Sequence, residues 1–415
     1  MRASLSCRFS RSARGPQSLP WWPALVLWLG LCHPAVAFEV FDAFQVHGFL
    51  SQGYILTTNN NFFGSSERGG SLDYTEIGVN ASWTPLPRLL FAAQGLFRRA
   101  GAGHGSDLDL DFGLMDYAFV STADWQLGMR LGRFKNPLGL YNDTRDVAFT
   151  RPSILLPESI YLDSFRQTFL SGDGGLVYGE IDNWWGDLSL EFGGGLPRGA
   201  DLDTELAIFL ADFPGTFQNE LSYVGRLTYQ LDGGRYKLAV SGAQLNLSYE
   251  PRFLPPQDLQ AGTDRFELLI LSAQYNGEHW AFTSEYALRH TEDQGFGPGF
   301  PDVAITGESY YFQGMYRVSS KWEAFLRYDV FYANRDDRDG AKLEAELAEF
   351  GIPGHILFAK DWTIGARYYV TPTFMVAAEY HHVDGTGWLP FQDNPDLGAR
   401  DKDWDLFALL VSYRF

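Results

Sequence analysis

The chain has 415 residues, a formal net charge of −19 and an aromatic content of 16%. The acidic balance argues against a nucleic-acid partner, because phosphates are bound by lysine and arginine. The length allows one large domain or two of ordinary size. Both cysteines, Cys7 and Cys32, lie near the start of the sequence, so the remaining chain has no thiol and no disulfide framework.

Residues 1–37 have the pattern of a secretory signal peptide. A basic first part is followed by an apolar run, residues 21–32, and by the small residues 35–37. The apolar run is too short to cross a bilayer, since a spanning helix needs about 20 residues. The pattern predicts cleavage after Ala37, so that residues 38–415 form the mature protein.

Apolar and polar residues alternate with period 2 along much of the remaining chain. The alternation is regular over residues 75–83, 322–332 and 407–415. Stretches of about ten residues with one apolar face are typical of strands in membrane β-barrels. A half-buried strand of a soluble sandwich has the same local pattern, so the spacing of the turns has to decide between the two.

The connections between these stretches alternate between short and long. Short turns rich in Pro, Gly, Asn and Asp are expected near residues 84–87, 122–124, 182–183, 232–234, 276–278, 319–320 and 371–373. Long polar connections are expected near residues 57–71, 98–106, 135–166, 194–220, 249–264, 290–304, 335–356 and 384–402. This order predicts an all-β fold, a transmembrane antiparallel β-barrel of about 16 strands that takes up residues 38–415 as one domain.

Tryptophans cluster beside the short turns. They are Trp83, Trp125, Trp184, Trp185, Trp280 and Trp322. An indole ring is stabilised at the membrane interface, where both its apolar body and its N–H are satisfied. The short turns are therefore expected at the periplasmic edge of the membrane.

Two stretches resemble bacterial outer-membrane proteins. The sequence ends in LVSYRF, and Tyr413 and Phe415 look like the C-terminal strand signal that the barrel assembly machinery reads. The stretch LGRFKNPLGLYND, residues 131–143, is similar to the Gly-Arg-x-Lys-x-Pro-x-Gly segment of porins related to the phosphate- and polyphosphate-selective group. Together with the strand pattern, these stretches make the chain resemble the trimeric porins of Gram-negative bacteria.

The resemblance implies a location, partners and a function. It implies insertion in the bacterial outer membrane, contact with lipid and lipopolysaccharide, and assembly as a homotrimer. It also implies a water-filled channel through which small hydrophilic solutes or ions diffuse passively. Neither a cofactor nor a metal is expected.

Residues 135–166 form the longest connection and the third long one. In the porins that the chain resembles, the third loop folds into the barrel and narrows the pore. We expect the apolar runs VAF and SILLP to lie against the barrel, and the charged side chains to face water. The expected charged residues of this constriction are Lys135, Asp143, Arg145, Asp146, Arg151, Glu158, Asp163 and Arg166. The alternative is an external loop that contributes only to the surface.

Charged residues also lie opposite the apolar, lipid-facing positions of the expected strands. They are expected to point into the pore and are Arg130, Arg226, Arg289, Arg317, Arg327, Arg367, Glu285, Glu323, Asp329 and Glu379. Most of the net negative charge lies in outer connections, where salt screens it within about 8 Å. We therefore predict a transverse field between the loop carboxylates and an arginine-bearing wall. It should give only weak net ion preference and favour small zwitterionic or anionic organic solutes.

The sequence has no recognisable catalytic motif, and we expect that the protein is not an enzyme. None of the patterns HExxH, CxxC, GxSxG or a phosphate-binding loop occurs. His381 and His382 are neighbours on a strand, so their rings face opposite sides and cannot hold one metal. Two alternatives remain: a phospholipase- or protease-like barrel enzyme, and a non-conducting structural or adhesin barrel.

Overall fold

The structure is a computed structural model that describes residues 38–41, 43–199, 202–209, 213, 215–252 and 259–415. The expected signal peptide, residues 1–37, lies outside the described residues. The cleavage site after Ala37 therefore stays a prediction.

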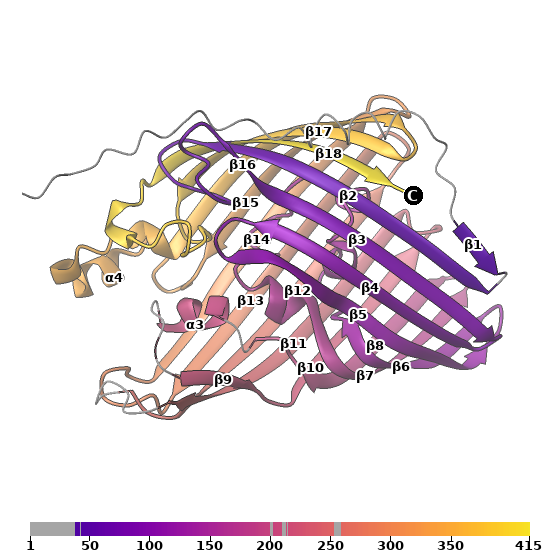
Figure 1. Cartoon of the computed structure of the whole chain (residues 1–415), viewed down its shortest axis with the longest axis horizontal. Helices are drawn as coiled ribbons and strands as arrows, with labels where there is room; N and C mark the ends of the chain where they lie inside the picture. Colours follow the sequence, from indigo (N-terminus) through magenta and orange to yellow (C-terminus); the bar gives the residue numbers. More distant parts are fainter. Residues whose placement is uncertain (1–37, 42, 200–201, 210–212, 214, 253–258) are drawn as a thin grey trace, which may run out of the picture. The chain divides into compact units, whose positions relative to one another are not determined.

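The described chain forms one antiparallel sheet that closes on itself. Its strands are β1 (Phe38–Phe41), β2 (Phe44–Thr57), β3 (Ser71–Leu86), β4 (Leu89–Ala100), β5 (His104–Ser121), β6 (Trp125–Lys135), β7 (Ser171–Asn183), β8 (Gly186–Leu196), β9 (Gly215–Asn219), β10 (Ser222–Leu231), β11 (Tyr236–Pro251), β12 (Gly262–Asn276), β13 (Trp280–Gln294), β14 (Val303–Arg317), β15 (Trp322–Tyr332), β16 (Phe358–Thr371), β17 (Phe374–Gly385) and β18 (Asp403–Arg414). Consecutive strands pair with each other around the ring (Figure 1), and β18 pairs with β2 to close it. The expected 16-stranded barrel is confirmed.

The sheet has 18 strands but the barrel has 16 strand positions, and two short strands account for the difference. β9 pairs with the far end of β11 and β10 with the rest of it, so the two occupy one place. Glu220 and Leu221 interrupt this strand, and Glu220 N still donates to Asn246 O at 3.0 Å. β1 pairs with the first residues of β2, which lie before the part of β2 that pairs with β18.

The connections alternate between short and long, as expected, with one exception. Short turns occupy residues 87–88, 122–124, 184–185, 232–235, 277–279, 318–321 and 372–373, and long connections occupy residues 58–70, 136–170, 197–214, 252–261, 295–302, 333–357 and 386–402. The long connection expected at 98–106 is wrong, because only residues 101–103 separate β4 from β5. Gly101 has a φ of +70°, which lets the chain reverse within these three residues.

In the described residues, helices are few and lie in the long connections. They are α2 (Arg166–Leu170), α3 (Leu202–Phe209) and α4 (Ala341–Glu346), with 3₁₀ turns η1 (Asn142–Thr144), η2 (Ala348–Phe350), η3 (Gly354–Leu357) and η4 (Leu397–Ala399). Among the described residues, no helix is long and apolar enough to cross a membrane.

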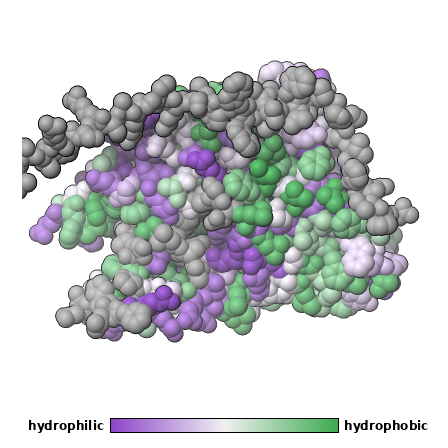
Figure 2. Space-filling view, in the orientation of Figure 1, coloured by the Kyte–Doolittle hydropathy of each residue, from purple (hydrophilic) through white to green (hydrophobic). Residues whose placement is uncertain are grey.

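The outer face of the barrel is apolar, as the alternation predicts. Large apolar side chains such as Phe312, Trp362 and Ile364 are more than half exposed, while their sequence neighbours point inward and are buried. Figure 2 shows hydrophobic side chains over the strands and more hydrophilic ones toward the end that carries α4. All six tryptophans beside the short turns are exposed. An apolar band with aromatic residues at its edge is the surface that a barrel presents to lipid.

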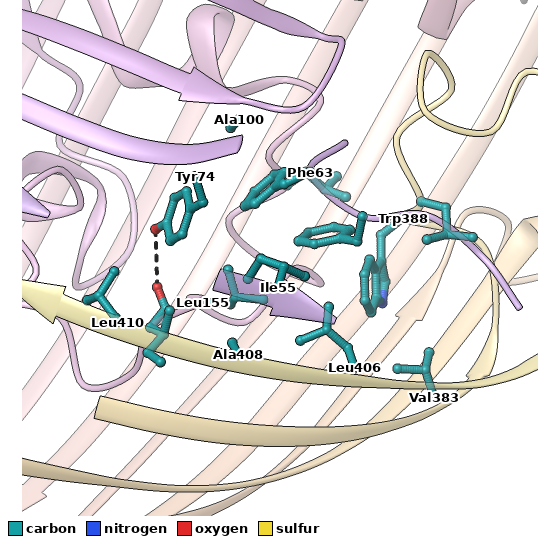
Figure 3. Close-up of a cluster of buried hydrophobic side chains, with 14 of the residues drawn as sticks. Ile55, Phe63, Tyr74, Ala100, Leu155, Val383, Trp388, Leu406, Ala408 and Leu410 are labelled. Atoms are coloured by element: carbon teal, nitrogen blue, oxygen red, sulfur yellow. Dashed lines mark hydrogen bonds between the residues drawn. The ribbon is translucent and has the colours of Figure 1, made fainter. Parts of the chain in front are cut away.

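The inner face packs against side chains from the long connections. One buried cluster joins inward residues of β2, β3, β17 and β18 to residues of connections 58–70, 136–170 and 386–402. Figure 3 shows its centre, where Ile55 and Leu406 lie near Phe63 and Trp388. A second cluster joins β10 to β14 with the same connection 136–170. Both clusters therefore combine inward-facing strand residues with residues of connection 136–170.

Candidate functional site

The candidate site is built around segment 136–170, which connects β6 to β7. Its middle part, Ser153 to Leu155, is held by two charged side chains of the barrel wall. Glu379 of β17 accepts from the backbone N–H of Ile154 and from that of Leu155, the latter at 3.2 Å. Arg327 of β15 donates to Ser153 Oγ at 3.0 Å and to Leu155 O at 3.1 Å. Both wall residues are almost fully buried.

The following part of the segment is bonded to the neighbouring wall. Arg289 of β13 donates to Ser159 O at 2.7 Å. Asp329 of β15 accepts weakly from Ser159 N at 3.4 Å. Glu285 of β13 accepts from Tyr161 Oη at 2.6 Å. Three charged wall residues therefore fix a short stretch of loop backbone and one tyrosine.

The first part of the segment reaches another stretch of the wall. Gly139 N donates to Ser241 Oγ of β11 at 2.8 Å. Arg226 of β10 donates to Gly139 O at 3.1 Å and to Asp143 Oδ2 at 2.9 Å. Gly139 has a φ of +58°, and a Cβ there would meet Tyr161 Oη at 2.4 Å. A glycine is thus required where the chain turns against this tyrosine.

A network of buried charges joins the segment to β3 and β4. Arg151 donates to Glu76 Oε2 of β3 at 3.0 Å. Arg98 of β4 lies 3.3 Å from Glu76 Oε1 and 2.8 Å from Asp163 Oδ1. Arg145 donates to Tyr161 O at 2.9 Å and lies 3.9 Å from Asp163. Because charges out of water need partners, these arginines and carboxylates fix one another in place.

A second set of buried charges holds the two ends of the segment together. Asp146 accepts from Lys135, at the end of β6, and from Arg166, at the start of α2. Lys135 also lies 2.5 Å from Asp111 of β5. The segment is therefore closed at its base by alternating positive and negative groups.

These contacts correct one sequence-based expectation. The charged side chains of the segment were expected to face water, but Arg145, Asp146, Arg151, Glu158 and Arg166 are all buried. The reason is that each of these residues except Glu158 meets a group of opposite charge or a backbone carbonyl. The wall supplies Glu76 for Arg151 and Lys135 for Asp146. The segment itself supplies Tyr161 O for Arg145 and the Asp146 carboxylate for Arg166. Burial and the neighbouring Asp163 carboxylate raise the pKa of Glu158 to about 8. This carboxyl is therefore largely protonated at neutral pH.

Not every expected wall residue contacts the segment. Arg130 of β6 is bonded to Asp116 of the neighbouring β5 at 3.1 Å and to Glu191 of β8, two strands away, at 3.2 Å. Arg317 and Glu323 form a 3.4 Å pair near the short turns. Arg367 connects this pair to segment 136–170, because it lies 2.7 Å from Glu323 and donates to Arg151 O at 2.6 Å.

Sequence reasoning missed three wall residues that contact segment 136–170. Glu76 and Arg98 face each other in the register of β3 and β4, and Tyr74 donates to Ile154 O at 3.4 Å (Figure 3). The alternation places all three on the inner face. How deeply these side chains are buried, and which residues of segment 136–170 they contact, depends on contacts between distant parts of the chain.

The histidine pair is arranged as expected. His381 is buried, with Nδ1 2.8 Å from Asp361 Oδ2, whereas His382 is exposed and lies 2.9 Å from Asp405. The prediction that the two rings face opposite sides is confirmed. In the part of the chain that the structure describes, no group of three His, Cys, Asp or Glu residues could hold a metal ion.

The residues of the expected assembly signal lie at the closing seam. Phe415 N donates to Gly48 O at 2.9 Å, and Gly48 N donates to Phe415 O at 3.0 Å. A Cβ at Gly48 would meet the Phe415 ring at 2.4 Å. The ring of Tyr413 lies 6.3 Å from that of Phe415. That assembly factors recognise these residues stays a prediction.

The chain is similar in structure to several outer-membrane proteins. OmpT, an outer membrane protein of Vibrio cholerae, has a TM-score of 0.55 at 11% identity, with 92% of this chain and 100% of that chain covered. The outer membrane channel DcaP of Acinetobacter baumannii has a TM-score of 0.56 at 10% identity, with 92% and 100% covered. An anion-selective porin from Comamonas acidovorans has a TM-score of 0.53 at 12% identity, with 90% and 99% covered.

The similarity lies in the fold and not in the sequence. No protein-family model matches the chain, and no curated protein matches it. The closed ring of 16 antiparallel strands, the apolar outer face and the full coverage of these barrels agree with one another. The chain has the fold of the outer-membrane porins of Gram-negative bacteria.

Proposed function

We propose that the chain is an outer-membrane porin in which segment 136–170 lies inside the barrel and constricts a channel for passive diffusion of small hydrophilic solutes or ions. One observation carries the proposal. The segment is hydrogen-bonded to Arg98 of β4 and to Arg289 of β13, strands from opposite sides of the ring. A connection can bond to both sides of a closed ring only from within it.

The physical chemistry of the segment supports this position. Irregular backbone at membrane depth is tolerated where it is buried in protein or lines a water-filled cavity. The wall satisfies backbone groups of the segment with Glu379 and Arg327, and its apolar residues pack on the inner face of the barrel. A rigid constriction of this kind selects solutes by size and by the field at its surface.

The charges around the segment favour weak ion selectivity. Arg151 faces Glu76, Arg98 faces Asp163, and Lys135 faces Asp111. Groups that neutralise one another within 3 Å or so leave a small field at a distance. Loop carboxylates facing wall arginines, as Asp143 faces Arg226, support the transverse field, but the pair of Arg151 and Glu76 has the opposite direction. We therefore propose little preference between small anions and cations.

A barrel enzyme is the less favoured alternative. His381, Asp361 and Thr363 lie together, but both the carboxylate and the hydroxyl contact the same ring nitrogen, Nδ1, at 2.8 and 3.1 Å. A catalytic triad needs the nucleophile on one ring nitrogen and the carboxylate on the other. All three residues are also buried, which closes them to a substrate.

We also propose a homotrimer in contact with membrane lipid and lipopolysaccharide, inserted by the barrel assembly machinery. One of the similar OmpT structures is described as a trimer form. The exposed apolar wall supplies the surface that lipid or a neighbouring copy would cover.

Conductance in a planar bilayer tests the proposed function. The purified, folded protein should insert in discrete steps and conduct in potassium chloride, whereas heat-unfolded protein should not. Mass measurement in native detergent complexes reports the oligomer separately. A folded barrel that inserts without conducting would support the alternative of a structural or adhesin barrel.

A further inference from the structure

A cavity of about 380 Å³ lies beside the end of segment 136–170, and Arg289 is one of its lining residues. It is enclosed by the end of segment 136–170 with α2, by α3, and by the inner faces of β11 to β15. A buried hydrogen bond between Thr168 and Thr204, 3.1 Å long, ties α2 to α3 beside it. Cavities of a few hundred Å³ are of the size that holds small organic ligands.

Most of the cavity wall is apolar and much of it is aromatic. Phe169 and Phe266 lie with ring centroids 5.2 Å apart, and Phe331 and Ile305 face the same space. A ligand that fills the cavity must therefore bring an apolar body, because water or an inorganic ion would leave these surfaces without contacts.

Two carboxylates supply the polar part of the cavity. Asp264 of β12 and Asp293 of β13 stand directly opposite each other in the sheet register, and both line the cavity. Asp264 is 6% exposed, and Asp293 Oδ1 is buried without a hydrogen-bond partner. Like charges directly opposite each other destabilise a sheet unless a cation or a proton is shared between them.

The described residues provide no cation for this pair. Arg289 also lines the cavity, but its guanidinium donates to Ser159 O at 2.7 Å and to Ser309 Oγ at 2.8 Å. It also lies 4.4 Å from the centre of the Phe331 ring. None of the described lysines and arginines forms an ion pair with Asp264 or Asp293. The pair therefore either shares a proton or takes a positive charge from a ligand.

We propose that this cavity binds small organic cations that carry an apolar or aromatic body. The ammonium group lies between the carboxylates of Asp264 and Asp293, and the body lies among Phe169, Phe266 and Phe331. The aromatic faces add a favourable interaction with the positive charge. Binding at this site does not require that the barrel conducts, so the inference goes beyond the proposed channel.

Calorimetric titration of the full, folded protein in detergent with 2-phenylethylammonium tests the proposal. Two probes serve as controls: 3-phenylpropionate has the ring but the opposite charge, and methylammonium has the charge without the ring. We expect saturable binding of 2-phenylethylammonium, and at least about tenfold weaker binding of each control probe, which corresponds to about 1.4 kcal/mol.

Variants test whether binding depends on Asp264 and Asp293 or on acidic residues in general. Asp264→Asn combined with Asp293→Asn should weaken binding at least about tenfold, while the near-isosteric amides remove the repulsion and should leave the barrel folded. The matched control is Asp182→Asn, in a second cross-strand aspartate pair with Asp187 near the turn 184–185. It should leave the affinity unchanged.

A further variant tests the cavity without changing either carboxylate. Ile305→Trp fills the cavity and should abolish binding while the electrophoretic shift on heating, which reports a folded barrel, is retained. Equal affinity for the anionic probe, unchanged affinity in the double Asn variant, or no binding to the wild-type protein would each overturn the proposal. Conductance is measured on the same samples, so that a failure of the channel is seen separately from a failure of this site.

Discussion

Two long connections of the barrel carry many charges but lie in opposite surroundings. Segment 136–170 has Arg151 and Asp163 buried in pairs with the wall, and Asp146 and Arg166 buried in a pair with each other. Connection 333–357, which contains α4, has no buried residue in that helix, and Phe350 is 75% exposed. Charge content therefore does not decide whether the charged residues of a long connection are buried.

What separates the two is the arrangement of their apolar residues. In segment 136–170 the run SILLP supplies Ile154, Leu155 and Leu156 to the two main buried clusters. In connection 333–357 the apolar residues of α4 are separated by charged ones, and no residue of α4 is buried. A compact apolar run can provide the free energy that the burial of nearby charges requires, provided that the wall offers partners.

The largest effect is expected from shortening one connection and not the other. Replacement of residues 140–160 by a short glycine-serine linker should raise single-channel conductance severalfold, because it removes the segment that we propose constricts the channel. The same replacement of residues 341–350 should leave conductance nearly unchanged. Unchanged conductance in the first variant, with the barrel still folded, would show that the segment lies outside the conducting path.

A smaller effect is expected on stability, where replacing a buried arginine should cost more than replacing an exposed one. Arg327→Met removes the donor to Ser153 and Leu155 and should destabilise the protein by about 3–5 kcal/mol, since the groups it leaves are buried. Arg338→Met, which breaks an exposed pair with Glu308, should cost at most about 1 kcal/mol. Urea unfolding in detergent measures both, and equal losses would contradict the difference in burial.

A third effect depends on pH. The pKa of Glu158 is raised to about 8 in the folded protein from an ordinary value of 4.5. The folded state then binds the proton more tightly, so stability should fall as pH rises through about 8. Melting temperatures between pH 6 and pH 9 should show a drop of several degrees that Glu158→Gln removes. Glu344→Gln, on exposed α4, is the matched control and should keep the drop.

The smallest effect concerns ion selectivity. Because the charges of segment 136–170 are paired, reversal potentials in a potassium chloride gradient should be small. Arg145→Ala should shift them toward cation preference by more than Asp336→Asn, in connection 333–357, shifts them in the other direction. Strong cation selectivity that survives Arg145→Ala and Arg327→Ala would show that the outer acidic connections control passage.

The fold was predictable because its determinants are local. Alternation with period 2 and the residues of the short turns are read from a few neighbours in sequence, and they give the strand order almost completely. The error at residues 98–106 has a local cause as well. Polar residues there predict a loop, but they continue β4 and β5 around a three-residue turn at Gly101.

The site was only partly predictable because its determinants are distant in sequence. Alternation places Arg327 and Glu379 on the inner face, and the structure agrees. It does not say that Arg327 meets Ser153, 174 residues away, or that Arg151 meets Glu76. Whether a charged residue ends in water or in a buried pair depends on such partners, so the expectation of a water-facing charged loop was wrong.

The pairing of β18 with β2 has a kinetic consequence. Ser51 Oγ and Ser412 Oγ are 2.8 Å apart and are separated by 361 residues. Contacts at such separations are slow to form, since a long flexible loop must be closed before any contact rewards it. Until that seam forms, the free edges of β2 and β18 expose unpaired backbone groups, which lipid cannot satisfy and other chains can pair with. Closure of this one strand pair is therefore expected to limit the rate of folding and to be the step at which aggregation competes with insertion.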